Sequence, residues 1–333
     1  SARMFVAVLF LILGVATAFE TQQLNAANRF HYDRYKVYSV VPTDRQTLDV
    51  LHAMMLSNIH LDFWKEPSNL NKKVTFMVPP KHQLRVVTDL RKAGIKFTVD
   101  YEDVESELIN PMWYSIDKRY AGPEPYVFDI NDYNTLADLY TWMETDLIAN
   151  CRADLICEFF SIGNSYEGRP INAVKVSKAG TGRKAYWVDA TTHAREWIAT
   201  ATITNIMNHV VVGGDANAVR LADSYDWYFV PVVNPDGYDY AWTNERLWRK
   251  NRRPTSASCY GVDLNRNFDW RWGNDGVSHF PCDDTYCGPN GGSEPETQAM
   301  STQLVNLGAT LNAVLTLHSY GNMWLFPWGN TVN

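Results

Sequence analysis

The sequence lacks any run of basic residues and any internal repeat or low-complexity tract. Lys and Arg number 30 against 37 Asp and Glu, which gives a net charge of -7 and argues against nucleic acid as a partner. Hydrophobic residues make up 46% and charged residues 20%, as in an ordinary folded protein. A length of 333 residues leaves room for two domains.

A hydrophobic run long enough to span a membrane is also lacking. The apolar stretch from Phe5 to Val15 is too short for a span, follows Arg3, and precedes the small-residue pattern Ala16-Thr-Ala18. We therefore predict a signal peptide over residues 1–18, with Met4 as the start and cleavage after Ala18. A buried N-terminal helix is the alternative. The expectation is a secreted, extracellular protein without a membrane partner.

Cysteine is scarce, and the number of cysteines is odd. With five cysteines, at least one is unpaired or pairs with another chain. Cys259 and Cys282 flank a stretch that we expect to be a long loop. The pairing of Cys151, Cys157 and Cys287 stays open.

The first hundred residues after the apolar stretch alternate between short strands and helices. The pattern predicts strands at 34–41, 59–64, 73–78 and 96–101, with helices at 44–56 and 81–93. This βαββαβ order is that of a small α+β, ferredoxin-like unit. A dibasic pair, Lys118-Arg119, and a Gly/Pro-rich segment to Pro125 follow, which predicts an exposed linker that is easily cleaved. A propeptide with a cut site, or an ordinary interdomain linker, would explain this arrangement.

The remainder of the chain predicts an α/β unit with a mixed, mostly parallel sheet flanked by helices. Its strands are expected at 157–162, 171–176, 185–189, 227–233 and 313–317, and its helices at 133–148, 197–211 and 294–307. Asn131 or Asp132 is a candidate cap for the first of these helices.

Two short motifs at predicted strand ends offer metal ligands. His193 and Glu196 follow the strand that ends at Asp189, and His318 follows the strand that ends at Leu317. His-x-x-Glu alone is a weak signal, because a surface His and Glu at a helix start are more common. With His318 the set is complete for a catalytic zinc site of the two-His, one-Glu kind, holding one Zn²⁺ per chain. Asp263 is a plausible acceptor for the other N–H of His193.

Arginines gather in the same motifs of this acidic chain. Arg195, Arg249, Arg252 and Arg266 would serve to bind a carboxylate or to stabilise an oxyanion at a polarised carbonyl. Solvated surface positions remain the alternative for Arg249 and for the neighbouring Arg253.

Six ordered motifs resemble the zinc carboxypeptidases of the pancreatic A/B type, which are secreted as zymogens. They are His193-Ala-Arg-Glu-Trp197, Ser165-Tyr-Glu-Gly-Arg-Pro170, Pro231-Val-Val-Asn-Pro-Asp-Gly237, Trp248-Arg-Lys-Asn-Arg252, Gly261-Val-Asp-Leu-Asn-Arg-Asn267 and Leu317-His-Ser-Tyr320. The resemblance begins near Tyr35 and continues to the last residue. It implies an inhibitory propeptide at 19–119, a catalytic domain at 120–333, and removal of C-terminal residues from peptides and proteins.

The resemblance also implies roles for single residues. Zinc is held by His193, Glu196 and His318, and Arg252 polarises the scissile carbonyl. Asn265 and Arg266 grip the terminal carboxylate, while Arg195, Arg249, Ser319 and Tyr320 line outer subsites. Cys259 pairs with Cys282, and a trypsin-like protease cuts after Arg119.

One departure from the family pattern concerns the end of the sequence. The family's catalytic glutamate, its closing tyrosine and its specificity residue lie well beyond the second zinc histidine, and the sequence given ends at Asn333. The expectation is a C-terminally truncated family member that binds zinc and, by itself, hydrolyses poorly. A zinc- and peptide-binding decoy is therefore one alternative. A related hydrolase of acylated amino acids, or a processing enzyme without a zymogen, is another. A-type versus B-type side-chain preference is not assigned.

Overall fold

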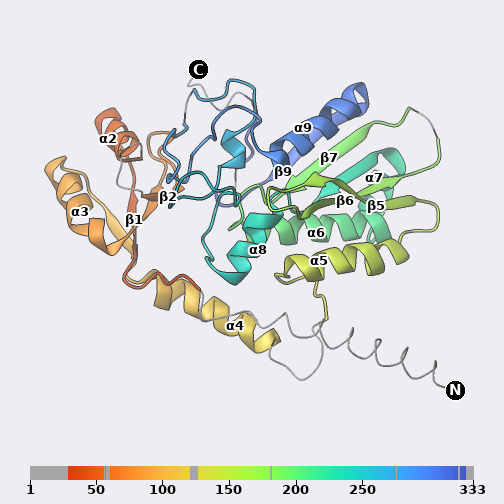
Figure 1. Cartoon of the computed structure of the whole chain (residues 1–333), viewed down its shortest axis with the longest axis horizontal. Helices are drawn as coiled ribbons and strands as arrows, with labels where there is room; N and C mark the ends of the chain where they lie inside the picture. The colour runs from red at the N-terminus through yellow and green to blue at the C-terminus, as the bar shows by residue number, and fades with distance from the viewer. Residues whose placement is uncertain are drawn as a thin grey trace, which may run out of the picture.

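The computed structural model describes residues 29–55, 57, 61–120, 127–180, 182–274, 276–321 and 323–327, without the side chains of 119 and 120. A smaller and a larger unit lie side by side (Figure 1). The predicted signal peptide and its cleavage point lie outside the described residues. Among those residues, no helix combines the length and the apolar character that crossing a membrane requires.

The smaller unit is the predicted βαββαβ arrangement. Its elements are β1 (Lys36–Val40), α2 (Arg45–Met55), β2 (Asp62–Lys65), β3 (Val74–Val78), α3 (Gln83–Lys92) and β4 (Thr98–Tyr101). The strands form an antiparallel sheet in the order β2-β3-β1-β4. The apolar faces of α2 and α3 contribute Leu51, Met54, Val86 and Leu90 to a core with β1 and β3. The helical and strand periodicities in the sequence therefore place this unit correctly.

A helix that the sequence analysis did not predict joins the two units. After a π-helical turn at Glu105–Ile109, α4 runs from Asn110 to Tyr120. Ile109, Trp113 and Ile116 are buried, at the spacing of one helix face. The dibasic pair Lys118-Arg119 thus lies in the last turn of a helix, which corrects the predicted irregular linker at this point; residues 121–126 lie outside the description.

The larger unit contains a mixed sheet in the order β5-β6-β8-β7-β9. Its strands are β5 (Ile156–Asn164), β6 (Pro170–Ser177), β7 (Ala185–Ala190), β8 (Asp226–Val230) and β9 (Leu311–Leu317). β7 pairs in parallel with β8 and β9, whereas β6 pairs antiparallel with β5 and β8. The sheet is therefore mixed, with its parallel pairs at the β7 side.

Helices cover both faces of this sheet. They are α5 (Leu136–Trp142, continued by a π-helical turn at Met143–Leu147), α6 (Trp197–Val212), α7 (Ala216–Ser224), α8 (Pro235–Thr243) and α9 (Pro295–Leu307). Figure 1 shows α5 and α6 on one side and α9 on the other. Successive residues of β7 point to opposite faces of the sheet, so Val188 packs in the core on the α6 side and Trp187 in the core on the α9 side.

The first helix of the larger unit begins later than the sequence suggested. Thr135 caps α5 by accepting a hydrogen bond from the Asp138 amide at 3.2 Å, so neither Asn131 nor Asp132 is the cap. The sequence analysis also missed α7 and α8, because their apolar residues do not form a long periodic stripe.

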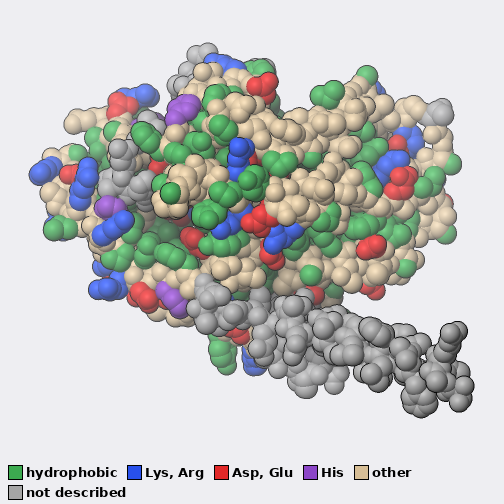
Figure 2. All heavy atoms as spheres, in the orientation of Figure 1, with side chains coloured by type: hydrophobic (Ala, Val, Ile, Leu, Met, Phe, Trp, Pro, Cys, Tyr) green, Lys and Arg blue, Asp and Glu red, His purple; other side chains and the backbone are tan. Residues whose placement is uncertain are grey.

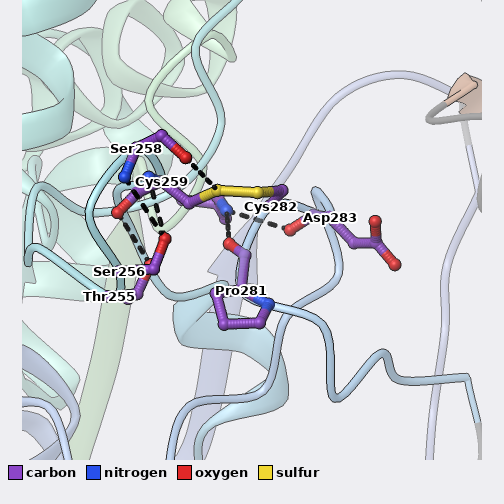
Figure 3. Close-up of a disulfide and its surroundings, with 8 residues drawn as sticks. Thr255, Ser256, Ser258, Cys259, Pro281, Cys282 and Asp283 are labelled. Atoms are coloured by element: carbon purple, nitrogen blue, oxygen red, sulfur yellow. Dashed lines mark hydrogen bonds between the residues drawn. A yellow bond between two sulfur atoms is a disulfide. The ribbon is translucent and has the colours of Figure 1, made fainter.

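Two disulfides fix loops of the larger unit. Cys259 bonds to Cys282, the pair that the resemblance implied, and Cys151 bonds to Cys157, while Cys287 is free and buried. Figure 3 shows the first bridge with Thr255, Ser256 and Ser258 beside it. The buried Lys250 ammonium donates hydrogen bonds to the carbonyls of Pro281 and Asp283 on both sides of Cys282, at 2.8 and 3.0 Å. The bridge and this lysine together fix the position of the loop around Cys282.

Charges are mixed on the face drawn in Figure 2, where acidic and basic side chains are interspersed. Two further arginines, Arg195 and Arg249, are largely buried and paired with carboxylates.

Candidate metal centre

Two neighbouring strands bring the predicted ligands together. β7 and β9 are parallel, and Ala190 lies opposite Leu317 in their register. The chain reaches His193 three residues after β7 and His318 one residue after β9. Because parallel strands end at the same sheet edge, residues 125 positions apart meet there.

The three side chains converge on one point. His193 Nδ1 lies 2.8 Å from Glu196 Oε1, His318 Nδ1 lies 2.9 Å from Glu196 Oε2, and the two Nδ1 atoms are 3.1 Å apart. Two ligands at about 2.05 Å from a tetrahedral zinc would be separated by about 3.3 Å. The donor set and its spacing therefore fit one zinc ion, and in the described residues it is the one such cluster.

Asp263, the predicted acceptor for the first histidine, lies within hydrogen-bonding distance of its ring. Its Oδ1 lies 3.2 Å from His193 Nε2 and also accepts the Asn265 amide at 2.9 Å. Burial opposes ionisation of Asp263, but Arg249 and His193 outweigh it and hold its pKa well below the ordinary value. A carboxylate in this place fixes Nε2 as the protonated nitrogen and leaves Nδ1 free to bind metal.

Asp263→Asn should raise the zinc dissociation constant about 10–100-fold, because the amide supports His193 less well than a carboxylate. Competition with a chromogenic chelator measures the constant. Asp49→Asn, at an exposed position of α2, is the matched control. An unchanged constant in Asp263→Asn would remove the supporting role.

The two arginines of the Trp248–Arg252 motif occupy different environments. Arg249 bonds through Nε and Nη2 to Asp263 Oδ2, at 3.1 and 2.8 Å, beside the metal ligands. Arg252 instead stacks on aromatic rings, 3.6 Å from the ring centre of Tyr240 and 4.6 Å from that of Trp248. Arg249 is therefore buried beside the metal ligands, which excludes the solvated alternative for this residue, whereas Arg252 is held by aromatic rings.

The other predicted substrate-binding arginines already hold carboxylates of the smaller unit. Arg195 Nη1 donates to Asp62 Oδ2 at 2.8 Å, and Arg266 Nη2 lies 3.4 Å from Glu66 Oε1. Tyr320 lies against Trp64, with ring centres 6.0 Å apart, and the Ser319 amide donates to Glu196 at 3.2 Å. Asn265 lies beside Arg266 in a short 3-10 turn at Leu264–Arg266. β2 and the residue after it thus contact three of the predicted substrate-binding residues, Arg195, Arg266 and Tyr320.

Sequence reasoning missed Asp62 and Glu66. They pair with residues 133 and 200 positions away, so no local spacing reveals them. The one available clue was that two carboxylates lie in and just after a strand of the smaller unit, which has no predicted catalytic residue.

A cavity of about 190 Å³ lies between the units beside these pairs. Its lining includes Tyr32 and Asp62 from the smaller unit and Arg195 and Glu245 from the larger one. The Tyr32 hydroxyl donates to Glu245 Oε1 at 3.3 Å. Burial, with Asp284 nearby, raises the pKa of Glu245 to about 7.

Glu245→Gln should flatten the pH dependence of the stability of the uncut chain. Between pH 4.5, the reference pKa, and about 7, the unfolded chain releases this proton and the folded chain keeps it, so wild-type stability falls as pH rises. The loss amounts to about 3 kcal/mol and is nearly complete by about pH 8. Melting temperatures from pH 4 to 8 measure it, with the exposed Glu144→Gln as control. Parallel profiles for wild type and Glu245→Gln would contradict the assignment.

Comparison with known proteins identifies the two units. The family model "Zinc carboxypeptidase" matches residues 145–333, and "Carboxypeptidase activation peptide" matches residues 38–110. Zinc carboxypeptidase A 1 of Anopheles gambiae is 35% identical over 96% of this chain and 71% of its own length. Human carboxypeptidase B is 34% identical over 90% of this chain and 70% of its own length.

The fold is also that of a solved enzyme. The crystal structure of carboxypeptidase A from Helicoverpa armigera matches with a TM-score of 0.76 and 24% identity, over 87% of this chain and 71% of that one. The zinc ligand set, the two segments matched by family models and the similar proteins all point to the same family. This chain belongs to the zinc carboxypeptidases of the A/B type that carry an activation propeptide.

Proposed function

We propose that the chain is a secreted zymogen whose activated form removes single C-terminal residues from peptides and proteins, in proteolysis of the digestive type. Residues 1–18 would be the signal peptide, 19–119 the inhibitory propeptide and 120–333 part of the enzyme. The observation that carries the proposal is that the zinc ligands lie beside guanidinium groups already paired with propeptide carboxylates.

The substrate's free carboxylate would bind to Arg266 and Asn265. A guanidinium binds a carboxylate through two parallel hydrogen bonds, and an internal peptide bond cannot replace this contact. Leaving such a group without its partner is costly, so binding energy would favour chain ends over internal sites. Arg195, Ser319 and Tyr320 would contact residues further from the end.

Arg249 would donate a hydrogen bond to the scissile carbonyl oxygen, after the substrate displaces one of the two hydrogen bonds from Arg249 to Asp263. A bound zinc supplies Lewis-acid polarisation of that carbonyl. The guanidinium beside the metal ligands adds a fixed positive charge in a largely buried site, where developing negative charge is stabilised most strongly.

The propeptide would inhibit by occupying these groups. Asp62 stands where Arg195 would meet substrate, and Glu66 reaches Arg266. Trp64 Nε1 donates to Asp62 Oδ2 at 2.9 Å and keeps that carboxylate aimed at Arg195. A trypsin-like protease cutting after Arg119 would release the propeptide and expose the site.

Stepwise shortening of a peptide tests the proposed function. The full-length protein, treated with trypsin and supplied with one equivalent of zinc, is incubated with a peptide acid and with the same peptide as its amide. Mass spectrometry should show loss of C-terminal residues from the acid alone, and a chelator should stop it. Tight zinc and peptide binding without shortening would favour the decoy instead.

A further inference from the structure

The residues before β1 lie across the connecting helix. Arg29 Nη1 donates to Asp117 Oδ2 at 2.8 Å and Nη2 donates to Oδ1 at 2.7 Å. The same guanidinium lies 3.9 Å from the ring centre of Trp113, one turn earlier in α4. With its side chain 7% exposed, Arg29 forms a two-bond carboxylate fork and a cation–π contact at once.

Further contacts tie this segment to both units; we call residues 29–32 the N-terminal arm. The Phe30 amide donates to the Asn244 carbonyl at 2.6 Å, and the Tyr32 amide donates to Glu105 Oε2 at 2.6 Å. The arm therefore joins the larger unit, the turn that precedes α4 and α4 itself.

Asp117 lies where a carboxylate would weaken a free helix. The C-terminal end of a helix carries partial negative charge, so an acidic side chain in the last turns is unfavourable. Pairing with Arg29 compensates that charge. The end of α4 is thus held by a residue 88 positions away rather than by its own sequence.

We propose that Arg29 is a latch that controls proteolytic activation by keeping the last turn of α4 wound. The inference rests on the proposed activation cut after Arg119, because that bond directly follows Asp117-Lys118 within α4. A protease needs the segment to open locally, and cleavage follows the population of the open form. Loss of the fork would raise that population without altering the bond that is cut.

The test compares trypsin cleavage of the full-length wild type, Arg29→Ala and Arg45→Ala. Arg45 belongs to an exposed ion pair with Asp49 in the same unit, so its variant also removes one trypsin site and one ion pair. Mass spectrometry follows the product that begins at Tyr120. We expect roughly ten-fold faster formation for Arg29→Ala, a smaller increase for Arg29→Lys and no change for Arg45→Ala.

Hydrogen exchange separates a local latch from general destabilisation. Amides of residues 115–120 should exchange faster in Arg29→Ala, while those of β3 (Val74–Val78) should not change. Equal cleavage rates in wild type and Arg29→Ala, or equal acceleration in Arg45→Ala, would overturn the latch and leave the proposed function intact. If no variant is cut after Arg119, the proposed activation site is wrong. In that case, equal hydrogen exchange at residues 115–120 in wild type and Arg29→Ala would overturn the latch separately.

Discussion

Arg266→Ala is expected to weaken binding of a peptide with a free C-terminal carboxylate roughly 100-fold in the activated protein. Removing one partner of a largely desolvated charge pair typically costs about 2–5 kcal/mol, and in the uncut chain, where Glu66 lies against it, the Arg266 side chain is 18% exposed. The amide of the same peptide should bind to wild type and to Arg266→Ala with equal affinity, because it cannot form the carboxylate contact in either protein. Calorimetry of both ligands measures the preference directly and does not depend on turnover.

Two further variants define the origin of that loss. Arg266→Lys keeps the charge but not the planar fork, so an intermediate affinity is expected. Arg271→Ala, at an exposed position of the same loop, should bind like wild type. If Arg266→Ala still prefers the acid to the amide, the assignment of Arg266 as the carboxylate-binding residue is wrong.

His318→Ala is expected to raise the zinc dissociation constant several-hundred-fold or more. Protein sites bind zinc with about 10–16 kcal/mol of apparent free energy, so one ligand in three is worth roughly 3–5 kcal/mol. His193 and Glu196 alone would hold the ion in a turn of the chain without the strand end that completes the set. Chelator competition measures the constant, and peptide shortening should be lost at limiting zinc.

A histidine elsewhere in the same unit is the control. His209 lies exposed in the last turn of α6, the helix that begins directly after Glu196. His209→Ala should bind zinc like wild type. Similar losses in both variants would mean that unfolding, and not ligand removal, explains the effect.

The metal site could be predicted from the sequence because each ligand follows a strand. The apolar runs ending at Asp189 and Leu317 identify buried strands, and parallel strands of one sheet end at a common edge. Only the adjacency of β7 and β9 had to be supplied by the fold. Asp263 was predictable for a related reason, since a metal-binding histidine needs an acceptor for its second N–H.

The connecting helix could not be predicted with the same reasoning. Its apolar positions, Ile109, Trp113 and Ile116, have helical spacing, but Pro111 and the following dibasic pair suggest an interruption. The helix runs without a break from the π-helical turn at Glu105–Ile109 into α4, so Pro111 lies inside a helical run, where the wider π-helical turn just before it accommodates the proline. Packing of Trp113 against Trp197 then stabilises a helix whose local sequence is ambiguous.

The assignment of the motif arginines shows a second limit. Arg249 and Arg252 are three residues apart and chemically identical, so spacing cannot decide which one faces the metal. The structure separates the two by their partners, a buried carboxylate for Arg249 and aromatic rings for Arg252. Pairings between units, such as Asp62 with Arg195, depend on docking and have no local signal.

Diffraction from crystals of the protein, recorded on both sides of the zinc absorption edge, tests the central claim most directly. One anomalous peak is expected within about 2.0–2.2 Å of His193 Nδ1, His318 Nδ1 and a Glu196 carboxylate oxygen. Zinc-equilibrated crystals without a peak there, or with the two imidazoles facing apart, would contradict the account.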